Sequence, residues 1–107
     1  MTGRLARSLE YGTERLRIED PELHDLLERE QVRQDRTLAM IAATSVADAS
    51  VLACEGSVVS NVTTEGYPGA RYHAGCEVVD RIEELATARA CTAFGARYAH
   101  GVNGPAL

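Results

Sequence analysis

The stretch Asn61–Gly75 constrains this chain more than any other, because it suits neither a regular helix nor a regular strand. It shows no apolar periodicity, and it is rich in glycine and proline, which interrupt regular elements. A connection of this length inside a small domain is usually either functional or disordered. The aromatic and imidazole rings in this stretch favour an ordered loop. We therefore expect an extended loop that carries function. Its turn-forming residues and rings are Gly66, Tyr67, Pro68, Gly69, Tyr72, His73 and Gly75.

Helical patterns flank this loop on both sides. An Asp-Pro-Glu sequence at 20–22 puts a capping carboxylate, a proline and an acid at a helix start, so we predict a helix from there to about Arg36. A second helix is predicted over Asp48–Val59. The strongest apolar stripe covers Cys76–Phe94, and Gly95 follows it as a C-cap.

The sequence after the last helix predicts one strand at Tyr98–Val102 and then a turn at Asn103–Pro105. About three helices, a long loop and a lone strand do not make a sheet, and a single strand cannot satisfy its own backbone groups. The fold class is therefore α/β, as the N-terminal part of a larger fold that is mainly helical within this chain. A core of this size is marginal, so we expect the chain to need a partner.

Charge and cysteine content exclude several classes of function. The 107 residues carry 11 Lys+Arg against 16 Asp+Glu, and the net charge of −5 argues against nucleic-acid binding. Residues 1–17 lack the apolar core of a signal peptide and no run suits a membrane helix, so we expect a cytoplasmic protein without a membrane partner. Three cysteines without a C-x-x-C pair predict neither a disulfide framework nor a metal site. Every basic residue is arginine, which leaves no lysine for a Schiff base.

The segment Thr64–Asp80 reads T-E-G-Y-P-G-A-R-Y-H-A-G-C-E-V-V-D. It resembles the loop of the serine hydroxymethyltransferase family, where the stretch is close to Y-A-E-G-Y-P-G-x-R-Y-Y-G-G-C-E-x-V-D. The similarity extends in both directions and covers residues 20–99. We therefore divide the chain into an N-terminal tail at 1–19, which is either a short helix or loose, and a partial serine hydroxymethyltransferase-like domain at 20–107.

The resemblance implies a fold type I pyridoxal-phosphate (PLP) transferase, a dimer with shared active sites that interconverts serine and glycine with tetrahydrofolate. In that family the catalytic lysine lies downstream of the region seen here, and this chain has no lysine. The resemblance thus implies that pyridoxal phosphate is held mainly by a partner, a large PLP-domain polypeptide that carries the lysine, in a hetero-oligomer. Tetrahydrofolate is a second candidate ligand.

The resemblance also assigns roles to loop residues. Glu65 matches the family's catalytic glutamate, whose carboxyl group can shuttle a proton at the substrate hydroxyl. His73 stands at the second tyrosine of the family's R-Y-Y and is a candidate acid or base. Tyr67, Arg71 and Tyr72 are the candidate substrate- or folate-binding residues, and for Arg71 pairing within the loop is the alternative. Loop conformation is assigned to Gly66, Pro68, Gly69 and Gly75.

Several positions depart from the family's pattern. Its I-A-S-E-N segment reads I-A-A-T-S here, so Ala43 stands where a serine contacts the substrate carboxylate, and Thr44 stands where the family has a glutamate. Thr63 replaces the first loop tyrosine, and Gly104–Leu107 lacks the hydroxyls of the turn that holds the PLP phosphate. These changes predict an altered substrate and argue against phosphate binding by this chain.

Three functions are compatible with this sequence. The first is the small subunit of a split enzyme, which carries out hydroxymethyl transfer or retro-aldol chemistry on a β-hydroxy amino acid or glycine and is inactive alone. The second is a non-catalytic partner that regulates or stabilises a PLP enzyme by imitating its N-terminal arm. The third is a truncated remnant. The apolar helix faces and the intact loop favour the first.

Overall fold

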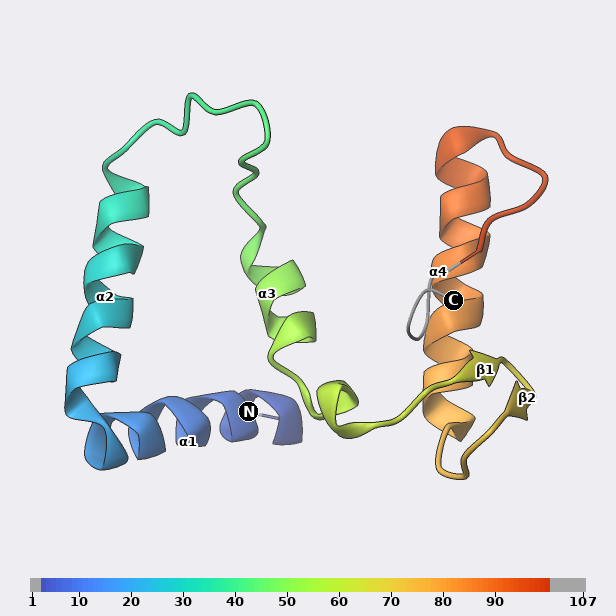
Figure 1. The fold of residues 1–107 in the computed structure, drawn as a ribbon, viewed down its shortest axis with the longest axis horizontal. Helices are drawn as coiled ribbons and strands as arrows, with labels where there is room; N and C mark the ends of the chain where they lie inside the picture. The colour runs from blue at the N-terminus through green and yellow to red at the C-terminus, as the bar shows by residue number, and fades with distance from the viewer. Residues whose placement is uncertain (1–2, 101–107) are drawn as a thin grey trace. The chain divides into compact units, whose positions relative to one another are not determined.

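The computed structural model describes residues 3–100, and internal contacts divide the chain into two units with their boundary between Ser57 and Val58. The first unit contains the helices α1 (Arg4–Glu19), α2 (Pro21–Asp35) and α3 (Ala49–Glu55) (Figure 1). The second contains the 3₁₀ helix η1 (Val58–Asn61), the strands β1 (Gly66–Tyr67) and β2 (Ala70–Arg71), and the helix α4 (Glu77–Phe94). The described part is mainly helical, as predicted for the N-terminal part of a larger α/β fold.

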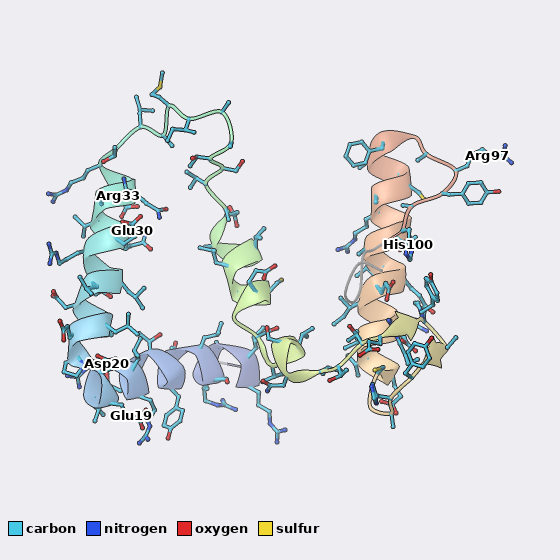
Figure 2. All side chains as sticks on the ribbon, viewed as in Figure 1. Glu19, Asp20, Glu30, Arg33, Arg97 and His100 are labelled. Carbon is cyan, nitrogen blue, oxygen red and sulfur yellow. The ribbon has the colours of Figure 1, made fainter. Side chains whose placement is uncertain are left out.

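Asp20 joins α1 to α2 and caps the helix on each side of it. Its backbone N–H donates to the Leu16 carbonyl at 2.8 Å, where α1 ends, and its carboxylate accepts from the Leu23 N–H at 3.0 Å, where α2 begins. Pro21 occupies the first helical position, which needs no backbone donor. The predicted helix start at 20–22 is thus confirmed, and Figure 2 labels Asp20 at the corner between the two helices.

Residues 4–19 form the whole of α1, a longer helix than the short one that the sequence suggested. Arg15 and Glu19, one helical turn apart, form an exposed ion pair on its surface. Ion pairs of this kind contribute little to stability. The helix also contacts α2. Gly56, which follows α3, lies close to α1. A Cβ atom added at Gly56 would be 3.7 Å from Leu9 Cδ2. Contacts within its own unit therefore support α1.

The helix α3 is shorter than the helix predicted over Asp48–Val59. It ends at Glu55 because Ser57 donates both its backbone N–H and its hydroxyl to the Cys54 carbonyl, at 3.2 and 2.7 Å. A serine that binds the nearby backbone in this way competes with continued helical hydrogen bonds. The prediction is therefore wrong beyond Glu55, where the chain passes through Gly56 into η1.

The predicted extended loop contains a small antiparallel hairpin that the sequence did not indicate. β1 and β2 pair Gly66 with Arg71 and Tyr67 with Ala70. A Pro-Gly sequence connects the strands, and Gly69 has a φ of +76°, which a type II turn requires at its third residue. The expectation of a loop without strands is wrong here, because this turn brings two short extended segments within hydrogen-bonding reach.

The helix α4 agrees with its prediction at both ends. It begins after Cys76 and runs over Glu77–Phe94. Gly95 ends it in the left-handed conformation with a φ of +60°, and the Ala96 N–H donates to the Cys91 carbonyl at 3.0 Å. The apolar periodicity and the terminal glycine therefore defined this helix correctly.

The strand predicted at Tyr98–Val102 is wrong in its described portion. Residues 98–100 form no strand, while residues 101–102 and the turn predicted at Asn103–Pro105 lie outside the described residues. The two described strands pair with each other in a sheet of order β1-β2. An extended segment without a neighbouring strand has no partner for its backbone groups and so gains nothing from extended geometry.

Burial is concentrated at the start of α4. Within residues 3–100, Cys76 and Glu83 are the only buried residues. The apolar stripe of α4 stays exposed, and Phe94 reaches 85% exposure. The other large exposed side chains of this stripe are Val78, Ile82 and Leu85. No described residue therefore covers the apolar stripe of α4, which is the most apolar helix face that the sequence predicts.

None of the helices within residues 3–100 combines the length and the apolar character that crossing a bilayer requires.

We predict that Asp20→Ala loosens the start of α2. The substitution removes the acceptor of the Leu23 N–H, and the loss of such a cap costs about 1 kcal/mol. Hydrogen exchange followed by NMR should therefore show the Leu23 amide exchanging about fivefold faster. Asp25→Ala removes an exposed carboxylate of α2 away from the cap and serves as the control. Equal exchange rates at Leu23 in the parent chain and in Asp20→Ala would contradict the prediction.

Candidate functional site

Glu65 and Tyr72 lie opposite each other across the open end of the hairpin. Glu65 directly precedes β1 and Tyr72 directly follows β2, and the Tyr72 N–H donates to the Glu65 carbonyl at 3.0 Å. This bond continues the pairing of Gly66 with Arg71 by one residue. Because cross-strand partners share one face of a hairpin, the side chains of Glu65 and Tyr72 belong to the same face.

The two faces of the hairpin differ in exposure. Side chains alternate between faces along a strand, which puts Glu65, Tyr67 and Tyr72 on one face and Gly66 and Arg71 on the other. The first three residues are exposed, and Tyr72 reaches 80%. Gly66 is half-buried, and the Arg71 side chain is only 4% exposed. The hairpin therefore presents a carboxyl group and two phenol rings on an open face.

Arg71 holds the covered face of the hairpin against α4. Its Nε donates to Asp80 Oδ1 at 2.7 Å, and its Nη2 donates to Glu83 Oε2 at 2.5 Å. Asp80 and Glu83 are three residues apart on α4 and so lie on one helix face. The side chains of Asp80 and Glu83 are 20% and 8% exposed, so the three charges form a largely desolvated network.

This network alters the acid–base behaviour of its members. The Arg71 guanidinium, helped by a hydrogen bond from the Gly69 N–H, holds the pKa of the Asp80 carboxyl below its usual value of 3.8. The hydrogen bond to Asp80 raises the pKa of Arg71, which also donates to Glu83. Asp80 is therefore ionised and Arg71 charged at neutral pH, which is the state in which their pairing is strongest.

The turn of the hairpin is also tied to α4. The Gly69 N–H donates to Asp80 Oδ2 at 3.0 Å, so one carboxylate contacts both the turn and Arg71. Gly66 has a φ of +109°, and a Cβ atom added there would overlap the Ala70 carbonyl oxygen. Glycine at this position allows a close approach of the two strands that a side chain would prevent.

Cys76 ties together the segments before and after the hairpin. Its buried thiol donates to the Thr63 carbonyl at 3.4 Å and to the His73 carbonyl at 3.8 Å. The His73 side chain itself is exposed and follows Tyr72 beyond the ladder. The backbone that carries His73 is therefore anchored, while its imidazole remains accessible in the described structure.

Tyr67 has an aromatic neighbour that no sequence motif indicated. Its ring centroid lies 5.3 Å from that of His100, with the ring planes tilted by 38°. Figure 2 labels His100 beside the middle of α4. The contact is a ring pair of ordinary geometry, so it helps to order the exposed tyrosine.

Sequence reasoning misses Asp80 and Glu83 as members of this site. The available signal is two carboxylates three residues apart on a helix that follows a loop with one arginine. The apolar periodicity of α4 directs attention to its other stripe, which remains exposed. The polar face of α4 packs against the hairpin instead, because charge pairing with Arg71 selects that face.

The described residues do not by themselves fit pyridoxal phosphate. The chain contains no lysine. Arg71 is the arginine of the hairpin, but its guanidinium is covered and already paired with two carboxylates. It therefore lacks the free donors that a phosphate group needs. The described part also contains no cluster of three or more histidine, cysteine or acidic side chains suited to a metal ion.

Comparison with known proteins gives consistent matches. A model of the family described as serine hydroxymethyltransferase matches residues 16–106. The chain is 48% identical over 81 residues to the serine hydroxymethyltransferase of Coprothermobacter proteolyticus, covering 76% of this chain and 20% of that protein. It is 51% identical over 79 residues to that of Bifidobacterium longum subsp. infantis, a match that covers 74% of this chain and 18% of that protein. It is 44% identical over 85 residues to the serine hydroxymethyltransferase of Onion yellows phytoplasma, a match that covers 79% of this chain and 20% of that protein. The chain thus spans about a fifth of the length of the curated relatives it matches.

We predict that the Asp80 carboxyl titrates below pH 3.8 and that Arg71→Met moves this midpoint upward. Because pairing lowers the pKa in the folded state, ionised Asp80 stabilises the hairpin above about pH 3.8. That contribution is lost as the pH falls through the lower folded value. An NMR titration of the Gly69 amide, which donates to Asp80, measures the midpoint. Glu84→Gln is the control on the same helix, and an unchanged midpoint in Arg71→Met would contradict the prediction.

Proposed function

Because the chain belongs to the serine hydroxymethyltransferase family, we propose that it supplies the N-terminal piece of a split enzyme of this family. A separate, larger polypeptide carries the lysine and holds pyridoxal phosphate in a hetero-oligomer with this chain. The assembly acts on a β-hydroxy amino acid or glycine by hydroxymethyl transfer or retro-aldol chemistry. The chain alone is inactive.

The exposed face of the hairpin is the observation that carries this proposal. Glu65 lies there with Tyr67 and Tyr72, on a backbone held by hydrogen bonds to both strands and to α4. A positioned carboxyl group of this kind can accept a proton from a substrate hydroxyl and return it. The two phenol rings provide flat surfaces for a substrate or a folate ring system. Glu65 is therefore assigned as the proton-transfer group, with Tyr67 and Tyr72 as binding residues and His73 as a second candidate acid or base.

The uncovered apolar side chains support the need for a partner. The stripe on α4 that ends at Phe94 stays exposed, and the described residues bury little apolar surface of their own. Large exposed apolar areas usually mark surfaces that another part of a fold or another protein covers. The lysine-bearing polypeptide of the proposal would cover this surface, and it would supply the remaining four fifths of the fold by analogy with the curated relatives.

The cofactor belongs to the partner in this proposal. Pyridoxal phosphate acts as an electron sink for bonds at the α-carbon of an amino acid. This chain contributes no lysine, and the guanidinium of Arg71 is already paired with two carboxylates, so the part proposed for this chain is limited to the hairpin face. Tetrahydrofolate is proposed as the one-carbon acceptor at the same face. The free thiols, one of them exposed, support a reducing compartment such as the cytoplasm.

A second candidate function rests on the departures in the loop between α2 and α3. Ala43 and Thr44 there replace the serine and the glutamate of the family's pattern. A chain without these groups suits a non-catalytic partner that regulates or stabilises a full-length relative. The two candidates differ in one respect that can be measured, because only the split enzyme requires the carboxyl group of Glu65.

We predict that this chain forms a PLP-binding complex whose turnover depends on Glu65. It is to be co-expressed with the polypeptide encoded beside it and, separately, with the Coprothermobacter proteolyticus enzyme shortened by its matching N-terminal segment. The purified complex should cleave serine and show a PLP absorbance that glycine alters. Glu65→Gln should lower kcat by about 10²–10⁴-fold, as expected for loss of a proton-transfer group.

The matched control for this experiment is Glu84→Gln, which changes an exposed carboxylate of α4 and should leave turnover unchanged. A complex whose turnover is insensitive to Glu65→Gln would favour the non-catalytic partner. A folded chain that binds neither polypeptide and alters no PLP absorbance would overturn both candidates.

A further inference from the structure

We propose that Arg71 is a positioning residue that sets the place of Glu65 through the backbone, with Asp80 and Glu83 as its anchors on α4. The inference rests on the proposed function, because it assigns to Arg71 a part in the reaction ascribed to Glu65. It assigns Arg71 to positioning rather than to direct contact with substrate or folate.

Arg71 holds the backbone on either side of Glu65. Arg71 Nη1 donates to the Thr64 carbonyl at 2.8 Å and to the Gly66 carbonyl at 3.3 Å. The carbonyl of Glu65 between them accepts from the Tyr72 N–H at 3.0 Å. Three consecutive carbonyl groups are therefore held, two of them by one nitrogen of Arg71. A peptide segment restrained at each unit gives its side chain a defined origin and direction.

Two carboxylates of α4 hold Arg71 itself. Its Nε and Nη2 bind Asp80 and Glu83, which extend from one face of a regular helix. The planar fork of arginine donates in fixed directions, so two anchored nitrogens determine where the third one points. Lysine carries a single ammonium group and cannot serve the Thr64 carbonyl and both carboxylates with the same geometry. Arg71→Lys therefore keeps the charge and removes the positioning.

Arg71 and Glu65 lie on opposite faces of the hairpin. Arg71 is on the covered face of the hairpin and is 4% exposed, while Glu65 is on the open face. Its three nitrogens are already donating to protein oxygens. The hydrogen bonds by which Arg71 reaches the neighbours of Glu65 therefore run to the main chain at Thr64 and Gly66.

The test is a double-mutant cycle in the co-expressed complex, with Arg71→Lys, Glu65→Gln and the double variant. Arg71→Lys should lower kcat by about 10–100-fold, the order expected for a displaced catalytic group. In the Glu65→Gln background the same substitution should cause no further loss, because the group that it positions is already gone. Glu84→Gln serves as the matched control. Losses that multiply in the double variant, or an Arg71→Lys enzyme with unchanged kcat, would overturn the inference.

A second measurement on the full chain without a partner separates this inference from the proposed function. Arg71→Lys should raise the hydrogen-exchange rates of the Tyr72 and Gly69 amides by about tenfold or more, since charge-assisted hydrogen bonds that hold the hairpin are lost. Retained protection of Tyr72 would overturn the inference even where the complex is active. If the complexes show no turnover, the proposed function fails, and lost protection of Tyr72 still supports the role of Arg71 in holding the Glu65 backbone.

Discussion

The hairpin that carries the candidate site depends on one guanidinium group. Arg71 joins two carboxylates of α4 to two backbone carbonyls of the loop, and Asp80 extends the same network to the turn. Two strands of two residues each have little stability of their own. The ion pairs are mostly shielded from water, so removing any one partner would leave a poorly solvated charge. A loop that reads as irregular in the sequence is held in this way at a defined place on a helix.

An amphipathic helix usually packs its apolar stripe against its own fold, and α4 does not do so. The polar face of α4 turns toward the hairpin of the same unit, and its apolar stripe, which includes Ile82 and Phe94, stays exposed. Charge pairs therefore hold the hairpin on α4, while no described residue covers the apolar stripe. The chain spans about a fifth of the length of its curated relatives.

How far the sequence predicted the structure depends on the range of each interaction. The start of α2 at Asp20 and the end of α4 at Gly95 were predictable, because a cap involves residues within one helical turn. The early end of α3 was missed, although the serine that ends it is also local. The hairpin and its anchors were missed because Arg71 reaches Asp80 and Glu83 across a turn whose geometry the sequence pattern did not specify.

The sequence by itself determined the family, the start of α2, both ends of α4, the candidate role of Glu65 and the lack of a lysine. These features follow from residue identity and from hydrogen bonds between near neighbours. Only the tertiary structure decided that Glu65 lies on an open face while Arg71 lies on a covered one, and that the polar face of α4 holds the loop. The reason is physical: the face of a side chain depends on strand register, and an ion pair depends on distance in space, which composition and periodicity do not encode.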